Sequence, residues 1–319
     1  MRVAIVGAGL AGLMAARPLA AAGHDVVLLD KGRSPGGRLA TRRVGDAVVD
    51  HGAQFFTVRS DAFAASVDAW RRESLVTEWC HGFGAEPDGY PRYAVRGGMN
   101  ALAKHLARGL DVRCSTMAFA IRPATGGGWS VGIDDGSAVP ADALVVTTPL
   151  PQASSLLMTS GVAVPVELAR TEYDRTLALL AVLDRPPVVP APGGVQRPDD
   201  AVSFVGDNVA KGISTVPALT VHATAEWSEA NWDDEPETVH ALLLDLAEPW
   251  LGEAKVVASQ VKRWRFATPR TPWPDPCWVA TEADGADAPL VLAGDAFAGP
   301  RIEGAALSGL AASAALLGR

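Results

Sequence analysis

The sequence predicts the α/β fold class with a parallel sheet, on the evidence of three consecutive segments at its start. A β-branched run at 2–6 precedes an Ala/Leu-rich run at 10–22, and a second apolar run follows at 26–29. This order of strand, helix and strand is the βαβ unit of a parallel sheet. Gly23 stands where a helix-ending glycine belongs, and Pro18 predicts a bend inside the helix.

A small antiparallel meander is expected next. Short strands are predicted at 117–121, 129–133 and 138–139, separated by the turn-forming sequences Gly-Gly-Gly and Asp-Asp-Gly. A buried strand at 143–147 follows and is stopped by Pro149. We expect the meander to lead through this strand back into the parallel sheet.

The rest of the chain indicates a second domain. Prolines cluster and tryptophans appear between about 165 and 263, where we predict a helix at 238–251. A strand at 290–293 and a final Ala-rich helix at 302–317 return to the first domain, and this helix is apolar nearly all round, which predicts burial. We expect a Rossmann-type domain with a discontinuous, mixed α+β substrate domain. The expected bounds are 1–57, 95–155 and 260–319 for the first, and 58–94 and 156–259 for the second.

Composition limits the kind of protein. The 319 residues are 48% hydrophobic and 20% charged, as in soluble globular proteins, and the net charge of −8 argues against a nucleic-acid partner. The three cysteines and six histidines show no metal-ligand spacing, so we expect no metal, reduced thiols and a cytoplasmic protein. Glycines interrupt the N-terminal apolar run, so we expect neither a leader peptide nor a membrane span.

A GxGxxG motif lies between the first strand and helix, formed by Gly7, Gly9 and Gly12. The first glycine allows a tight turn, the second lets a pyrophosphate approach, and the third lets the helix pack on the strand. The helix N-terminus points N–H groups at the phosphates, and Asp30 ends the second strand where ribose hydroxyls are bound. The residues expected at the nucleotide are Gly7, Gly9, Ala11, Gly12, Asp30 and Lys31.

The segment after Asp30 distinguishes between two dinucleotides. Gly36-Gly37-Arg38 stands where a nicotinamide-only dehydrogenase would enter its next helix. Two glycines suit a loop that folds back over a pyrophosphate, and Arg38 is a natural charge partner for phosphate. We therefore expect Gly37 and Arg38 to contact FAD.

Several segments together resemble the bacterial renalase-type proteins, small relatives of the flavin amine oxidases and phytoene desaturases. The resemblance is carried by residues 1–57 and returns at 96–99, 263–267 and 294–306. Residues 155–255 take no part in it. The resemblance implies an FAD-dependent oxidoreductase.

Further FAD contacts follow from the resemblance. It implies that Asp295, in a second FAD motif, holds the ribityl or pyrophosphate region, and that the last helix stabilises reduced flavin with its N-terminus. It also implies that residues 50–54 run beside the isoalloxazine ring and that the backbone of Met117 meets the adenine. The residues concerned are His51, Gly52, Ala53, Gln54, Met117, Gly294, Asp295, Glu303, Gly304 and Ala305.

No catalytic side chain is fixed by the sequence, since the flavin carries the chemistry. His51 is expected to be a hydrogen-bond partner of the flavin, and two alternative roles stay open for it, a catalytic base and a structural histidine. Gln54 is a further candidate for a catalytic residue. Trp264 and Arg265 either line the substrate pocket or pack at the domain seam.

The resemblance implies a small-molecule substrate and molecular oxygen as partners. Dihydro-isomers of NAD(P)H would transfer hydride to flavin N5, and oxygen would reoxidise the flavin to give hydrogen peroxide. The product is an aromatic pyridinium, so no strong base is required, and no Ser/His/Asp or paired-carboxylate set appears. Two alternatives stay open: an amine oxidase or desaturase-like enzyme with Lys211 or Lys262 near the flavin, and a non-catalytic flavin-binding sensor or interaction protein.

Overall fold

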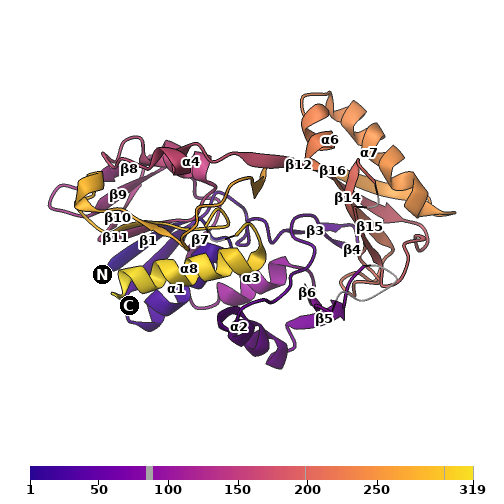
Figure 1. Ribbon diagram of the computed structural model, residues 1–319, viewed down its shortest axis with the longest axis horizontal. Helices are drawn as coiled ribbons and strands as arrows, with labels where there is room; N and C mark the ends of the chain where they lie inside the picture. Colours follow the sequence, from indigo (N-terminus) through magenta and orange to yellow (C-terminus); the bar gives the residue numbers. More distant parts are fainter. Residues whose placement is uncertain (84–88, 198, 298, 319) are drawn as a thin grey trace. The chain divides into compact units, whose positions relative to one another are not determined.

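The computed structural model describes residues 1–83, 89–197, 199–297 and 299–318 (Figure 1). The chain divides into two compact units, each built from separate segments: unit 1 from Met1–Gly37, Ala103–Glu172 and Pro269–Arg319, and unit 2 from Arg38–Leu102 and Tyr173–Thr268. Residues 38–57, expected in the FAD-binding domain, belong to unit 2. The compact units and the expected functional domains are therefore different divisions of the chain, and the functional one stays a prediction.

Unit 1 contains a six-stranded sheet in the order β17-β18-β11-β1-β2-β7. Neighbours from β18 to β7 are parallel, whereas β17 is antiparallel to β18. The central strands are apolar and buried, as expected for a parallel sheet covered on both faces. The predicted α/β, Rossmann-type fold is confirmed. The strands are β1 Arg2–Val6, β2 Asp25–Leu29, β7 Asp111–Arg113, β11 Ala143–Val146, β17 Trp278–Val279 and β18 Leu290–Leu292.

Helices α1 and α8 of unit 1 lie side by side (Figure 1). A Cβ added to Gly309 of α8 would lie 2.2 Å from the carbonyl oxygen of Ala11, so the two backbones touch. The expected burial of the last helix is confirmed along one side of it. Its small residues are buried, while Leu307, Leu310 and Leu316 are half-exposed. The helices are α1 Leu10–Ala21, which continues through Pro18, α4 Leu150–Leu157, α5 Val166–Ala169 and α8 Ile302–Leu316, with a 3-10 turn at Glu282–Asp284.

The predicted antiparallel meander is also confirmed. Strand β9 pairs with both β8 and β10, and the chain then enters β11, which pairs in parallel with β1. The strands are β8 Ala118–Pro123, β9 Trp129–Ile133 and β10 Ala138–Ala141. Helix α3, Asn100–Leu106, spans the boundary of the two units.

Unit 2 contains a five-stranded sheet in the order β13-β14-β15-β12-β16. Side chains of β12 alternate between two cores: Leu179 and Ala181 belong to the core beside α7, and Leu180 and Val182 pack with the β3–β4 hairpin. The hairpin ends at Asp50 and so delivers the next residues to this face of the sheet.

The strands of unit 2 are β3 Thr41–Val44, β4 Ala47–Asp50, β5 Val76–Cys80, β6 Arg92–Val95, β12 Tyr173–Leu183, β13 Gly194–Gln196, β14 Val202–Asp207, β15 Ala218–Ala223 and β16 Val256–Pro269. The helices are α2 Asp61–Arg72, α6 Ala225–Ala230 and α7 Pro236–Leu251. Among the described residues, no helix has the length and apolar character to cross a membrane.

Candidate functional site

The GxGxxG loop connects β1 to α1. Gly7 has a φ of +109°, and a Cβ added there would lie 2.6 Å from Thr147 Oγ1. A Cβ added to Gly12 would lie 2.0 Å from the carbonyl oxygen of Gly7, so α1 packs directly on the loop. Gly9 has an ordinary φ of −73°, and an added Cβ would meet no described atom within 4 Å. The chain itself requires two of these glycines, whereas the space beside Gly9 is open, as the predicted approach of a pyrophosphate needs.

Asp30 closes this loop from the end of β2. Its carboxylate accepts the N–H of Ala8 and the N–H of Gly32, each at 2.7 Å. The N–H of Gly36 donates to the carbonyl of Ala8 at 2.8 Å, so residues 31–37 fold back onto the glycine loop as predicted. A carboxylate offers about four acceptor positions, so Asp30 can also receive ribose hydroxyls.

A second group of predicted residues follows β18. Gly294 has a φ of +143°, and its N–H donates to Ser308 of α8 at 2.8 Å; Asp295 is buried. Two buried polar atoms in unit 1, Thr148 Oγ1 after β11 and Trp273 Nε1, have no hydrogen-bond partner among the described residues. Buried polar groups are normally paired, and a ligand with its own donors and acceptors would pair them.

The start of α8 is built for close approach. A Cβ added to Gly304 would lie 2.2 Å from the carbonyl oxygen of Gly299, and no side chain caps the helix at Arg301. Glu303 and Ala305 stand beside Gly304 in the first turn, half-buried. The N–H groups at a helix start form an anion-binding end, in keeping with the role expected for it.

Three further predicted residues of unit 1 differ in exposure. Ala11 is buried beneath Gly309, and Lys31 is exposed. Met117 exchanges both of its backbone hydrogen bonds with Asp134, its N–H at 3.2 Å and its carbonyl at 3.0 Å. Its side chain is exposed, and its carbonyl can accept a second hydrogen bond, so the predicted backbone contact with an adenine stays a prediction.

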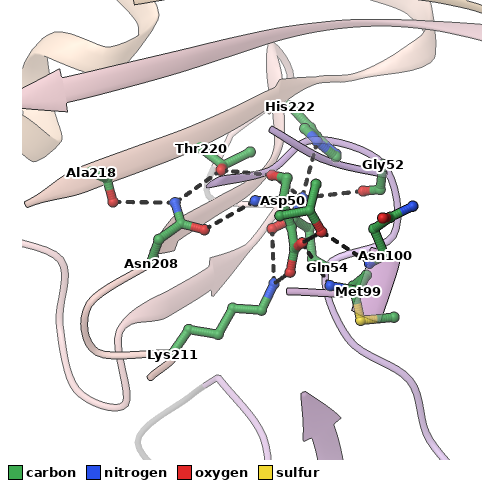
Figure 2. Close-up of polar contacts among 11 residues, drawn as sticks. Asp50, Gly52, Gln54, Met99, Asn100, Asn208, Lys211, Ala218, Thr220 and His222 are labelled. Carbon is green, nitrogen blue, oxygen red and sulfur yellow. Dashed lines mark hydrogen bonds and ion pairs between the residues drawn. The ribbon is translucent and has the colours of Figure 1, made fainter. Parts of the chain in front are cut away.

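In unit 2, the main chain of 50–54 is held by hydrogen bonds from side chains. The Asp50 carbonyl accepts Thr220 Oγ1–H at 2.9 Å and Gln54 Nε2–H at 2.8 Å, and Gln54 also donates to the Gly52 carbonyl at 3.1 Å (Figure 2). A Cβ added to Gly52 would lie 2.1 Å from the carbonyl oxygen of Arg38. The segment is a rigid, close-packed turn in which Gly52 admits no side chain.

A buried ion pair lies at the base of this segment. Lys211 Nζ, from the β14–β15 connection, is 2.6 Å from Asp50 Oδ2, and the two side chains are 1% and 0% exposed (Figure 2). Burial lowers the pKa of the Lys211 ammonium, and the adjacent Asp50 carboxylate opposes that change. The pair forms the buried charged centre of the segment.

His51 is buried between this network and β16. Its ring stacks on Trp264 at a centroid distance of 5.4 Å, and its carbonyl accepts the Trp264 Nε1–H at 2.7 Å. Burial, with the charges of Lys262, His222 and Arg42, lowers the pKa of His51 to about 4. The ring is therefore neutral at pH 7, and its Nδ1 has no hydrogen-bond partner in the described part of the chain.

The remaining predicted residues of unit 2 are placed differently from one another. Arg38 donates through one nitrogen to the carbonyls of Phe266 and Ala267, at 3.2 Å each, which ties the Gly-Gly-Arg segment to β16. Arg265 is exposed, on the opposite face of β16 from Trp264. The expected pair Trp264–Arg265 is thus split, and only Trp264 lies against His51. Ala53 is half-buried, and its N–H donates to the Arg38 carbonyl at 2.9 Å.

Sequence reasoning missed several residues of this region. His222 lies on β15, 3.4 Å from Gln54 Nε2, and burial and Lys211 lower its pKa to about 4. Asn208 Nδ2 donates to Thr220 at 3.1 Å.

A group of four aromatic side chains was also missed. Their rings contact one another edge to face or tilted, at 5.0–6.5 Å between centroids, and they belong to Phe55, Trp79, Phe83 and Phe204. The alternation of Thr220 and His222 on one strand face was the one available signal. Within the described residues, no cluster of three or more metal-ligating side chains occurs.

A glycine loop between the first strand and helix of a Rossmann-type sheet, closed by Asp30, is typical of nucleotide-binding proteins, and two family comparisons make the class specific. A profile described as NAD(P)-binding Rossmann-like domain matches residues 5–70, and one described as flavin containing amine oxidoreductase matches residues 59–317. The chain belongs to the flavin containing amine oxidoreductase family. It is an FAD-dependent oxidoreductase. The open space at Gly9, the close packing at Gly12 and Gly304, and the Thr148 and Trp273 atoms that have no partner among the described residues fit that cofactor.

Individual relatives agree at the level of the fold. Hydroxyneurosporene desaturase of Rubrivivax gelatinosus is 52% identical over 58 residues, which are 18% of this chain and 11% of that enzyme. The chain thus matches only a small part of that enzyme. Three solved structures align over 100% of this chain and 99–100% of their own: a protein of Exiguobacterium sp. 255-15 provisionally assigned as a protoporphyrinogen oxidase (14% identity, TM-score 0.76), wild-type putrescine oxidase bound to putrescine (16%, 0.75) and an oxidoreductase of Methanosarcina mazei (15%, 0.65).

Proposed function

We propose that this oxidoreductase is renalase-like and oxidises dihydro-isomers of NAD(P)H, reduced at the wrong ring position, with oxygen as the electron acceptor. In this proposal the residues predicted in unit 1 bind the dinucleotide part of FAD, and residues 50–54 run beside its isoalloxazine ring. The charge around His51 is the observation that carries the proposal.

The groups that lower the pKa of His51 and His222 include three cations, Lys262, Arg42 and Lys211. The buried carboxylate of this region, Asp50, is already paired with Lys211 at 2.6 Å. A protonated amine would gain no carboxylate here and would meet like charges. A dinucleotide carries phosphates and a neutral dihydropyridine ring, so its charge suits this surrounding.

The reaction needs little from the side chains. FAD, when bound, supplies the acceptor for the hydride. The substrate loses one hydride and becomes an aromatic pyridinium; the hydride, one proton and molecular oxygen together give one hydrogen peroxide. No proton is removed from carbon or nitrogen of the substrate, which agrees with a neutral His51 that holds a hydrogen bond and is a poor base.

Trp264 contributes orientation. Its indole N–H fixes the His51 carbonyl and its ring fixes the imidazole plane, so Nδ1 keeps one direction toward its ligand. We assign His51 as the hydrogen-bond partner of the flavin or substrate and Trp264 as the group that orients it.

Product analysis under air tests the proposal. The purified FAD-loaded protein is incubated separately with each dihydro-isomer, with ordinary NADH and with putrescine as the matched amine. We expect one NAD(P)⁺ and one hydrogen peroxide for each isomer molecule consumed, and far slower consumption of ordinary NADH and putrescine. Turnover of the amine without turnover of the isomers would refute the proposal.

A second candidate is an amine oxidase or desaturase-like activity, which the family assignment itself favours. Two similar proteins, putrescine oxidase and hydroxyneurosporene desaturase, point to substrates such as putrescine or hydroxyneurosporene. The position of Lys211 weighs against an amine, since its ammonium is held by Asp50 within a closed hydrogen-bond network.

A further inference from the structure

The ion pair of Lys211 and Asp50 spans 161 residues of sequence, and further hydrogen bonds hold both of its members. Lys211 Nζ donates to Asp50 Oδ2 at 2.6 Å, while Asp50 Oδ1 accepts Thr41 Oγ1–H at 2.5 Å and the Met99 N–H at 2.8 Å. Buried ion pairs are retained when hydrogen bonds satisfy their remaining positions, because each charge alone is strongly unfavourable in the interior. The carboxylate is therefore held at two points of unit 2 besides the ammonium.

The network continues from the ion pair to the segment that follows it. Lys211 Nζ is 3.5 Å from Gln54 Oε1, on the side of the amide that accepts. The other side of the amide, Nε2, donates to the carbonyls of Asp50 and Gly52 and lies 3.4 Å from His222 Nε2 (Figure 2). The ammonium and the two carbonyls thus favour the same one of the two orientations of the Gln54 amide.

That orientation fixes the main chain on both sides of His51. Asp50 and Gly52 are the neighbours of His51, and both of their carbonyls are held by Gln54. The His51 carbonyl is held by Trp264 at 2.7 Å. Three consecutive carbonyls are fixed, and His51 Nδ1 is a buried side-chain atom of the turn that has no hydrogen-bond partner among the described residues.

We propose that Lys211 is a positioning residue, which acts through Asp50 and Gln54 to hold the 51–53 turn so that His51 presents Nδ1 to the flavin or substrate. It touches neither of these itself, because its ammonium is committed to Asp50 and Gln54. The inference rests on the proposed function for the placement of residues 50–54 beside the flavin.

Three variants test the role: Lys211→Met, Asp50→Asn and the double variant. Lys255→Met, which removes an exposed lysine of the same unit, is the matched control. Three quantities are measured on the FAD-loaded proteins: the unfolding temperature, the reduction potential of the bound FAD and the NMR signals of the His51 ring.

Lys211→Met should lower the unfolding temperature, because Asp50 stays buried without its cation. The double variant carries neither charge and should recover most of that temperature. Its FAD potential and His51 signals should remain shifted, since the ammonium that contacts both residue 50 and Gln54 is gone. Lys255→Met should resemble the wild type in all three quantities.

Two results would overturn the inference. If the double variant recovers wild-type potential and His51 signals together with the unfolding temperature, the pair only stabilises the fold. If the double variant stays as unstable as Lys211→Met, the buried charges are not the cause of the loss. None of the three measured quantities depends on turnover, so failure of the proposed reaction would leave this test intact.

Discussion

The rings of His51 and Trp264 stack with planes 21° apart, and the same tryptophan donates its indole N–H to the His51 carbonyl at 2.7 Å. One side chain of β16 thus fixes both the ring and the main chain of the histidine. The histidine is neutral at pH 7 and buried, which makes it a fixed hydrogen-bonding group and a poor proton carrier. This relationship leads to the first two predictions.

Trp264→Phe should keep the ring contact and lose the hydrogen bond to His51. We expect a loss of about 1 kcal/mol in the free energy of unfolding, the usual value of one such bond, and weaker FAD binding. Urea unfolding and FAD titration measure the two effects. Trp250→Phe, a half-buried tryptophan of the α7 core, serves as control; equal FAD affinity in Trp264→Phe and wild type would contradict the account.

Acid should destabilise the protein through His51 and His222. Both have a folded pKa of about 4, below the ordinary value of 6.5, so between these values the unfolded chain binds protons that the folded chain does not. Stability is therefore complete above about pH 6.5 and falls as the pH drops toward 4, by up to about 1.4 kcal/mol per pH unit for each ring. His222→Asn should flatten this slope in urea unfolding series; an unchanged slope contradicts the assigned pKa direction.

Lys262→Met should raise the pKa of His51, because Lys262 is the leading charge that lowers it. Burial remains in the variant, so the pKa should stay below 6.5. An NMR titration of the imidazole signals measures the change. Lys255→Met, which removes an exposed lysine of unit 2, is the control and should leave the pKa of His51 unchanged. An equal pKa shift in both variants would contradict the prediction, because it would show a general effect of net charge.

Gly9→Ala and Gly12→Ala should separate ligand approach from packing. A methyl group at Gly12 would lie 2.0 Å from the Gly7 carbonyl oxygen and should disrupt the fold, whereas at Gly9 it meets no described atom within 4 Å. We expect Gly9→Ala to keep the unfolding temperature of the FAD-free protein and to lose FAD affinity by a factor of ten or more, about 1.4 kcal/mol. Unchanged affinity would remove the glycine loop from the FAD site.

Local signals made the fold predictable. The βαβ unit, the meander and the fold-back of residues 31–37 each depend on glycine positions and apolar periods within a few residues of one another. Burial of the last helix was predicted from its composition, but composition does not tell which side of an apolar helix meets a neighbour. The buried side of α8 contains Gly309, which allows backbone contact with α1 at Ala11.

The site was less predictable, because its contacts are distant in sequence. Lys211 was noted only as a lysine that an amine oxidase could place near the flavin, and its partner Asp50 lies 161 residues away. The alternation of Thr220 and His222 indicates a shared strand face, but not that this face of β15 contacts the 50–54 turn. Trp264 and Arg265 were grouped as neighbours, although adjacent residues of a strand face opposite sides.

Anaerobic mixing of the FAD-loaded protein with a dihydro-isomer of NAD(P)H, followed by its visible absorption, tests the central claim most directly. The account predicts rapid bleaching of the flavin bands by the isomer and no bleaching by putrescine at the same concentration. Flavin bands that persist with the isomer and bleach with the amine would contradict it.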